Sequence, residues 1–249
     1  MQTEQDKIKQ VFKKLSEEDI ANITQELDDL KSFSAHENVE LTAEQRAVMT
    51  YKAAEKTKEL FDILKLDYKN DVNLKDTPFR FASMQVNELM IGRFTKAPRI
   101  ESFDELITTE KQFDDINSDS LYETIVTKKI DLHSMCSHHL MPFSAEGQGS
   151  YALISYVPNG KFLGISKLQR IADWYGRRPQ LQENLTRQIF NHVCKTIDSN
   201  NVMVAMSNLI HTCETQRGVE SNCGATSTIQ FGGVFKDSNL RSEILLQHK

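Results

Sequence analysis

The chain has 249 residues, of which 30 are Lys or Arg and 35 are Asp or Glu, so its formal net charge is −5. Hydrophobic residues make up 39% and charged residues 26%, proportions typical of a globular protein rather than a disordered or membrane one. No apolar run approaches the ~18 to 20 residues of a membrane span, and the first ten residues lack the apolar stretch of a signal peptide. Four cysteines are too few for a disulfide scaffold, and the mild acidity argues against nucleic-acid binding. We expect a cytoplasmic protein with reduced thiols, no membrane association and no nucleic-acid partner.

The first 77 residues contain neither glycine nor proline, which predicts a mostly helical region. Ser16 with Asp19, and Thr42 with Gln45, have the spacing of capping boxes. A helix is expected over residues 43–66. The first 30 or so residues are the most polar, and they fit either a docked helical pair or a loosely held arm.

A second helix is predicted from Asp76-Thr77-Pro78 to about Ile91, with Asp76 as the cap and the proline in the first turn. Beyond residue 120 the pattern becomes alternating and β-branched. It predicts strands over 122–132, 150–157, 202–210 and 225–231 and helices over 166–175 and 180–197. This order favours an α+β fold, with an antiparallel sheet and helices on one face.

The densest group of reactive side chains is Ser134-Met135-Cys136-Ser137-His138-His139. A second group, His211-Thr212-Cys213, lies at the end of a predicted strand. Thiolate and imidazole are preferred zinc ligands, and three of them could bind zinc and leave its fourth position to water, as in catalytic sites. The alternative is a buried free cysteine beside unrelated histidines. Cys194 and Cys223 are expected to play no part.

Two further features could bind a ligand. The predicted helix at Gly164-Ile165-Ser166-Lys167 has Ser166 as its expected cap and Arg170 one turn in, a typical anion site, although a solvated surface helix fits the pattern as well. Glu183 could accept two N–H groups of a guanine, or it could be an ordinary solvated glutamate.

These stretches, in this order, resemble the GTP cyclohydrolase I family. The matching segments are DTPFRFASM, SMCSHHLMPF, GISKLQRIADWYGRRPQLQENLT, HTCETQRG and TSTIQFGGVFK, and the resemblance covers roughly residues 45–249. It implies a tunnelling fold, in which the sheets of neighbouring subunits join into a barrel. We accordingly expect an N-terminal helical region over 1–70 and a catalytic domain over 71–249.

The resemblance also implies roles for individual residues. The zinc ligands would be Cys136, His139 and Cys213, and the proton-transfer histidines would be His138 and His211. Glu183, with Gln182 nearby, would anchor the guanine. The triphosphate would be held by Ser166, Lys167, Arg170 and Arg217, together with Arg80 from an adjacent subunit.

The implied reaction is the zinc-dependent conversion of GTP into 7,8-dihydroneopterin triphosphate with release of formate, the first step of pterin, folate or deazapurine synthesis. Water attacks C8 of the purine while a histidine protonates the imidazole nitrogen. The implied assembly is a homodecamer with active sites at subunit contacts.

This chain departs from the family pattern in two places. Ser137 stands where the family commonly has Glu, and the segment 144–155 is longer and includes Gly147 and Gly149. Two other functions are alternatives: a same-fold enzyme with a cysteine nucleophile and a nicotinamide cofactor, and an inactive, zinc-stabilised structural homologue. The pairing of both halves of a metal site opposes the first, and the retained guanine and phosphate residues oppose the second.

Overall fold

The structure is a computed structural model that describes residues 3–100, 102–103, 124–145, 150–159, 162–217 and 225–248. The chain divides into two compact units, Met1–Lys96 and Ala97–Lys249. None of the helices in the described ranges is long and apolar enough to span a membrane.

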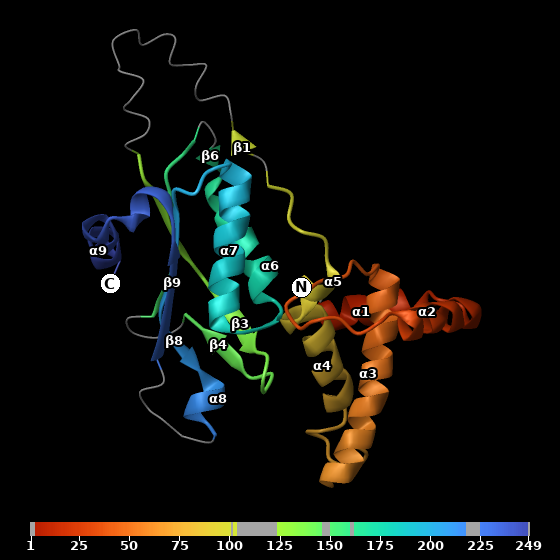
Figure 1. The fold of residues 1–249 in the computed structure, drawn as a ribbon. Coiled ribbons are helices and arrows are strands. Elements are labelled where there is room, and N and C mark those ends of the chain that lie inside the picture. The colour runs from red at the N-terminus through yellow and green to blue at the C-terminus, as the bar shows by residue number, and fades with distance from the viewer. Residues whose placement is uncertain are drawn as a thin grey trace. The chain divides into compact units, whose positions relative to one another are not determined.

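The first unit is helical, as the shortage of glycine and proline predicted. Its elements are α1 (Glu4–Lys13), α2 (Glu17–Asp29), α3 (Ala43–Leu64), α4 (Thr77–Met84), the π-helical turn η1 (Gln85–Leu89) and α5 (Ile91–Phe94) (Figure 1). Both predicted capping boxes are confirmed, because the side chains of Ser16 and Thr42 accept the N–H groups of Asp19 and Gln45. The helix over 43–66 is likewise confirmed to within two residues.

The polar first 30 residues are a docked helical pair rather than a loose arm. Phe12 of α1 stacks on Tyr51 of α3 with ring centroids 3.7 Å apart. In α2, Asp28 lies 2.6 Å from the Nζ of Lys52 in α3. Both helices are therefore held by side chains of α3.

The predicted helix from Thr77 to Ile91 is interrupted. Its start is right, but the Asp76 side chain makes no capping hydrogen bond and instead lies 3.7 Å from the guanidinium of Arg80. After Met84 the chain widens into η1, where the buried Asn87 donates its amide to Thr50 Oγ1 at 2.9 Å. This contact with α3 depends on tertiary packing, which the sequence pattern of the helix did not indicate.

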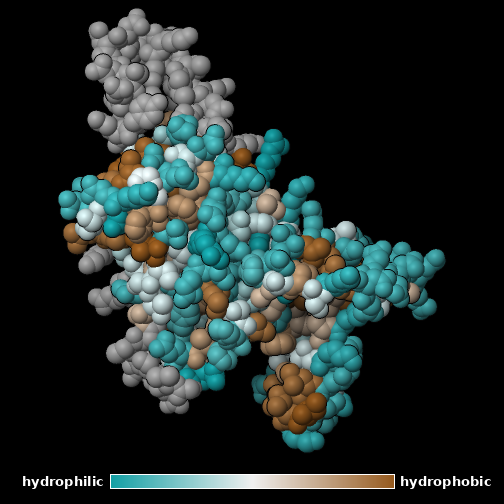
Figure 2. All heavy atoms as spheres, viewed as in Figure 1, coloured by the Kyte–Doolittle hydropathy of each residue, from teal (hydrophilic) through white to brown (hydrophobic). Residues whose placement is uncertain are grey.

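Apolar side chains are exposed at the C-terminal end of α3. Phe61 is buried, but Ile63 is 73% and Leu64 57% exposed. They contribute to an apolar patch on the surface of the first unit (Figure 2).

The second unit contains the sheets and the long helices α6 and α7. Its strands are β1 (Ser102–Phe103), β2 (Val126–Ile130), β3 (His133–Cys136), β4 (Pro142–Ser144), β5 (Tyr151–Tyr156), β6 (Phe162–Leu163), β7 (Pro179–Gln180), β8 (Val202–His211) and β9 (Ala225–Phe231). Its helices are α6 (Ile165–Gly176), α7 (Gln182–Ile197), α8 (Thr212–Thr215), the 3₁₀ turn η5 (Gly233–Lys236) and α9 (Ser238–Gln247). The four long predicted strands and the two predicted helices are confirmed, the strand over 225–231 with the predicted bounds and the others with shifted ends. Residues 122–123 of the first predicted strand lie outside the described residues.

The main sheet has the order β2-β5-β8-β4-β3-β7, with β9 also paired to β8. The expectation of an antiparallel sheet is wrong at one edge, because β7 pairs with β3 in parallel, Cys136 opposite Gln180. The sheet is therefore mixed within an α+β fold. In the sequence, the short β7 follows α6 and precedes α7. Because β7 pairs with β3, the start of α7 is held close to Cys136.

Helices cover both faces of the sheet, which corrects the expectation of helices on one face. Ile154 of β5 and Val204 of β8 pack with α6 and α7 in one core cluster. The alternate residues Leu153 and Met203 pack with Phe235 and with Ile244 of α9 in a second cluster. Figure 1 shows α9 on the side of the sheet opposite α6 and α7.

Candidate metal and nucleotide site

Strand pairing brings the two reactive segments together although they are far apart in the sequence. β4 pairs with β8, with Phe143 opposite His211. β3 and β4 are joined by a tight turn in which the Cys136 N–H donates to Met141 O at 2.8 Å. Thr212 Oγ1 also donates to Pro142 O at 2.6 Å. The turn that carries Cys136 and His139 is thereby placed beside Cys213.

Three candidate ligands converge as the resemblance implied. The ligand atoms of Cys136, His139 and Cys213 all lie within 4.8 Å of one another. Cys136 is buried, Cys213 is half-buried and His139 is exposed, so the cluster opens to solvent on the histidine side. Two thiols and one imidazole are a donor set suited to zinc with one open position. The residues present therefore fit the metal that the resemblance implied.

The electrostatics of this cluster link the protonation of its side chains to metal binding. Burial raises the pKa of the Cys213 thiol, and the neighbouring Cys136 raises it further by hydrogen bonding and by charge repulsion. Desolvation, together with Arg217 and His138, lowers the pKa of His139. A bound cation would reverse the penalty on the thiolates, because metal binding displaces their protons. Arg217 contacts His139 Nε2.

The two expected proton-transfer histidines are close to this cluster in the sequence, since His138 precedes His139 and His211 lies two residues before Cys213. His138 Nδ1 is 3.9 Å from Cys136 Sγ. His211 ends β8, and its ring stacks on Phe143 with centroids 4.5 Å apart and planes 10° apart. Burial lowers the pKa of His211, although Glu214 and Glu183 act in the opposite direction.

Gln182 and Glu183 begin α7 but point to different surroundings. The Gln182 side chain is buried, and its Oε1 is 2.7 Å from His211 Nε2. Glu183 is exposed in the first turn of α7. Glu183 is thus available to a ligand, whereas the polar atoms of Gln182 are used within the protein.

The expected phosphate residues are only partly brought together. Ser166, Lys167 and Arg170 occupy the first two turns of α6, and among the described residues no hydrogen bond joins them to the metal cluster. The expectation that Ser166 caps this helix is wrong, because the helix already begins at Ile165 after Gly164 and Ser166 lies inside its first turn. Arg80 belongs to the first unit.

Of the two departures from the family pattern, the structure describes the contacts of Ser137 but not the two glycines of the longer segment. The Ser137 N–H donates to Gln180 O at 3.0 Å, so this residue helps to attach the cysteine turn to β7. A backbone bond of this kind does not depend on the side chain. Gly147 and Gly149 lie outside the described residues, as does Cys223.

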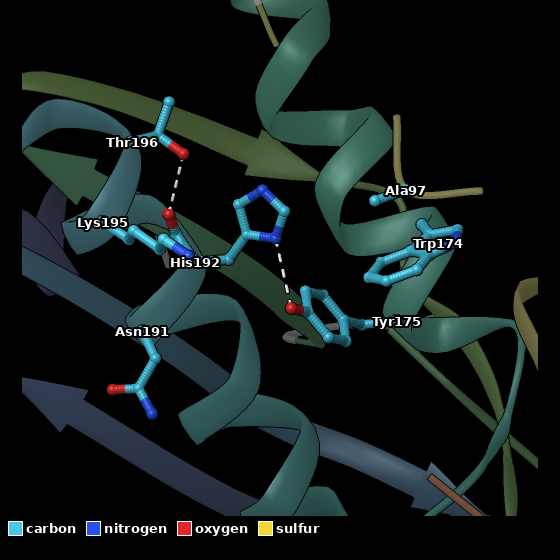
Figure 3. Close-up of a pocket in the computed structure, with 7 residues that line it drawn as sticks. All are labelled: Ala97, Trp174, Tyr175, Asn191, His192, Lys195 and Thr196. Atoms are coloured by element: carbon cyan, nitrogen blue, oxygen red, sulfur yellow. Dashed lines mark hydrogen bonds between the residues drawn. The ribbon is translucent and has the colours of Figure 1, made fainter. Parts of the chain in front are cut away.

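A separate cavity of about 520 Å³ lies on the helical layer of the second unit. Its lining is formed by Ala97, Trp174, Tyr175, Asn191, His192, Lys195 and Thr196 (Figure 3). His192 Nδ1 and Tyr175 OH are 3.1 Å apart in this lining. None of the expected site residues lines this cavity. The candidate site is therefore identified by its reactive side chains and not by this cavity.

The sequence of this chain matches a known protein family over most of its length. The model of the GTP cyclohydrolase I family matches residues 53–249. The chain is similar to GTP cyclohydrolase 1 of Wigglesworthia glossinidia brevipalpis, with 35% identity over 78% of this chain and 82% of that protein. It is also similar to GTP cyclohydrolase 1 of Buchnera aphidicola, with 34% identity over 78% and 81%, and to that of Salmonella arizonae, with 33% identity over 75% and 77%.

The fold and site define an α+β protein with a cluster of two cysteines and one histidine, with two further histidines nearby in the sequence. The chain belongs to the GTP cyclohydrolase I family. It is therefore an enzyme of the hydrolase class, and the resemblance seen in the sequence is confirmed.

Proposed function

We propose that the chain converts GTP and water into 7,8-dihydroneopterin triphosphate and formate in a zinc-dependent reaction. The observation that carries the proposal is the convergence of Cys136, His139 and Cys213 within 4.8 Å, next to His138 and His211. These three residues would hold the zinc ion. When bound, the ion would supply Lewis acidity toward the water that adds to C8 of the purine.

The protein's own groups would move protons and orient the substrate. A histidine that is neutral near pH 7 can accept a proton and return it, and the lowered pKa of His211 supports that role. His138 would serve the second proton transfer at the leaving nitrogen. After C8 departs as formate, the ribose rearranges and recloses onto the pyrimidine amine.

Substrate recognition would divide between two helix starts. Glu183, exposed at the start of α7, would accept the ring N–H and the exocyclic amine of guanine, a pairing that adenine cannot make. Ser166, Lys167 and Arg170 at the start of α6, with Arg217, would hold the triphosphate. Arg80 would join them from an adjacent subunit.

We further propose that the protein is a cytoplasmic homodecamer with the tunnelling fold, its sheets joined into a barrel across subunits. The exposed apolar side chains at the end of α3 support an oligomer, since patches of this kind mark protein contacts. The division into a helical region over 1–70 and a catalytic domain over 71–249 is part of the same proposal.

The test is incubation with GTP, with and without a chelator, followed by measurement of formate and of fluorescent pterin. We expect both products with zinc, neither with the chelator, and recovery when zinc is added back. Replacement of Cys213 by Ala should abolish zinc binding and turnover, whereas Cys194→Ala, at a half-buried thiol of α7 outside the cluster, should preserve both.

Other outcomes would identify the rival functions. A zinc-replete protein that yields no product would favour the inactive structural homologue. Nicotinamide-dependent reduction of a related deazapurine would favour the same-fold enzyme with a cysteine nucleophile. Full activity in zinc-free Cys213→Ala protein would contradict the proposed metal site.

A further inference from the structure

Gln182 is surrounded by groups that determine which way its side-chain amide faces. One side-chain end is 3.1 Å from Thr226 O and 3.0 Å from Thr228 Oγ1, and the other is 2.7 Å from His211 Nε2. A backbone carbonyl can only accept a hydrogen bond, so the end beside Thr226 must be the NH₂ group. The amide oxygen therefore faces His211.

A hydroxyl pair supports the same orientation. Thr186 Oγ1 lies 2.8 Å from Gln182 O and 3.3 Å from Met206 Sδ. A carbonyl oxygen is a much stronger acceptor than a thioether sulfur, so the only proton of this hydroxyl is donated to Gln182 O. Thr228 Oγ1, 2.7 Å from Thr186 Oγ1, must then be the donor in that pair. Its lone pair is left to accept from the Gln182 amide. The circuit from Gln182 through Thr228 and Thr186 back to Gln182 closes with every donor matched to an acceptor.

The orientation of Gln182 in turn determines how His211 is held. Because an amide oxygen can only accept, the neutral His211 ring must carry its proton on Nε2, which leaves the Nδ1 lone pair for the reaction. The ring plane is held independently by its stack on Phe143. Gln182 and Thr186 are each 2% exposed, so solvent has little access to the amide and the hydroxyl that these two residues contribute.

We propose that Gln182 is a positioning residue for His211, supported by Thr228 and Thr186, rather than a ligand of the guanine. The catalytic consequence rests on the proposed function, whereas the orientation of the ring does not. A glutamine whose amide already makes three hydrogen bonds within the protein has little capacity left for a purine. Guanine recognition then falls to Glu183.

The kinetic test compares Gln182→Leu, which keeps the volume but removes the acceptor, with Gln182→Glu, which restores an acceptor for the Nε2–H. We expect Gln182→Leu to lower kcat on the order of 100-fold with KM for GTP changed less than about threefold, since partners that orient functional groups contribute about 10- to 100-fold. Gln182→Glu should recover at least about tenfold of that loss. Thr228→Val removes one hydrogen bond to the Gln182 amide but keeps the amide itself, and it should lower kcat by about three- to tenfold. This variant replaces Gln182→Leu in the test if Gln182→Leu does not fold.

A matched control is Gln169→Leu, since that glutamine bonds to Asp131 and Asp173 outside this circuit. It should keep the wild-type kcat. An increase in KM with unchanged kcat in Gln182→Leu would overturn the proposal and make Gln182 a substrate ligand.

A second readout needs no turnover. In zinc-loaded protein labelled with ¹⁵N-histidine and free of GTP, the His211 signal, assigned with a His211→Gln sample, should show the Nε2–H tautomer. The preference should be lost in Gln182→Leu. A wild-type Nδ1–H tautomer would overturn the assignment even if the protein turns over GTP, and an Nε2–H signal in a protein that does not turn over GTP would contradict only the proposed function.

Discussion

Glu183 and Gln182 show how adjacent residues on one helix can have opposite surroundings. Leu181 precedes the helix in an extended conformation, Gln182 is turned into the sheet toward Thr228 of β9, and Glu183 is left exposed. An exposed carboxylate in the first turn of a helix is favoured by the helix dipole. It also remains free to accept hydrogen bonds from a ligand.

We predict that Glu183→Gln lowers kcat/KM for GTP by about 10- to 150-fold, because each hydrogen bond to a charged group contributes about 1.5 to 3 kcal/mol. The measurement is steady-state pterin formation at several GTP concentrations. Glu243→Gln on α9, a helix on the other face of the sheet, is the control and should match the wild type. An unchanged kcat/KM in Glu183→Gln would remove this residue from guanine recognition.

Among the elements, the close contact between α6 and β3 connects the helical layer to the candidate ligands Cys136, His139 and Cys213. A Cβ placed on Gly176, the last residue of α6, would lie 2.8 Å from the His133 carbonyl oxygen at the start of β3. That separation is shorter than a van der Waals contact, so the strand would have to move. The same strand ends at Cys136.

Gly176→Ala should therefore destabilise the protein by about 1 to 3 kcal/mol, the usual cost of overpacking, and should also weaken zinc binding. Urea unfolding and a competition titration with a zinc chelator measure the two effects. Ile189→Val on α7 is the control: it should lose about 0.5 to 1.5 kcal/mol of stability and keep the wild-type zinc affinity. Unchanged zinc affinity in Gly176→Ala would show that β3 tolerates the displacement.

The elements that the sequence predicts are stabilised by contacts between neighbouring residues. The elements that it does not predict are stabilised by contacts with distant segments. The capping boxes at Ser16 and Thr42 involve residues three apart, so the pattern is complete within one turn. β3, β4 and β7 are two to four residues long and depend on partners elsewhere in the sequence. A strand so short has no measurable alternation, and its existence follows from pairing.

At the scale of the whole molecule, we expect the half-buried His192, outside the site, to make folding sensitive to pH. Burial lowers the pKa of His192, and Lys195 and Arg178 lower it further. Since the folded pKa lies below the unfolded value near 6.5, the unfolded state binds the proton first as the pH falls. The contribution of this group to stability is therefore present above about pH 6.5 and decreases below it.

We predict that the free energy of unfolding decreases less between pH 7.5 and 5.5 in His192→Gln than in the wild type. Urea unfolding at both pH values measures the difference. His248→Gln, at the end of α9, is the control and should keep the wild-type pH dependence. An equal decrease in His192→Gln and wild type would assign the pH sensitivity to other groups.

The sequence alone determined the long helices, the long strands, the chemical identity of the candidate metal ligands and the family. These follow from local hydrogen bonding, from periodicity and from motifs read along the chain. Only the tertiary structure decided that β4–β8 pairing places Cys213 beside Cys136, that β7 makes the sheet mixed and that α9 covers its second face. It also turned the Gln182 amide toward His211, a contact between residues 29 positions apart. The physical reason is that such contacts arise from pairing and packing between distant segments, which no local pattern contains.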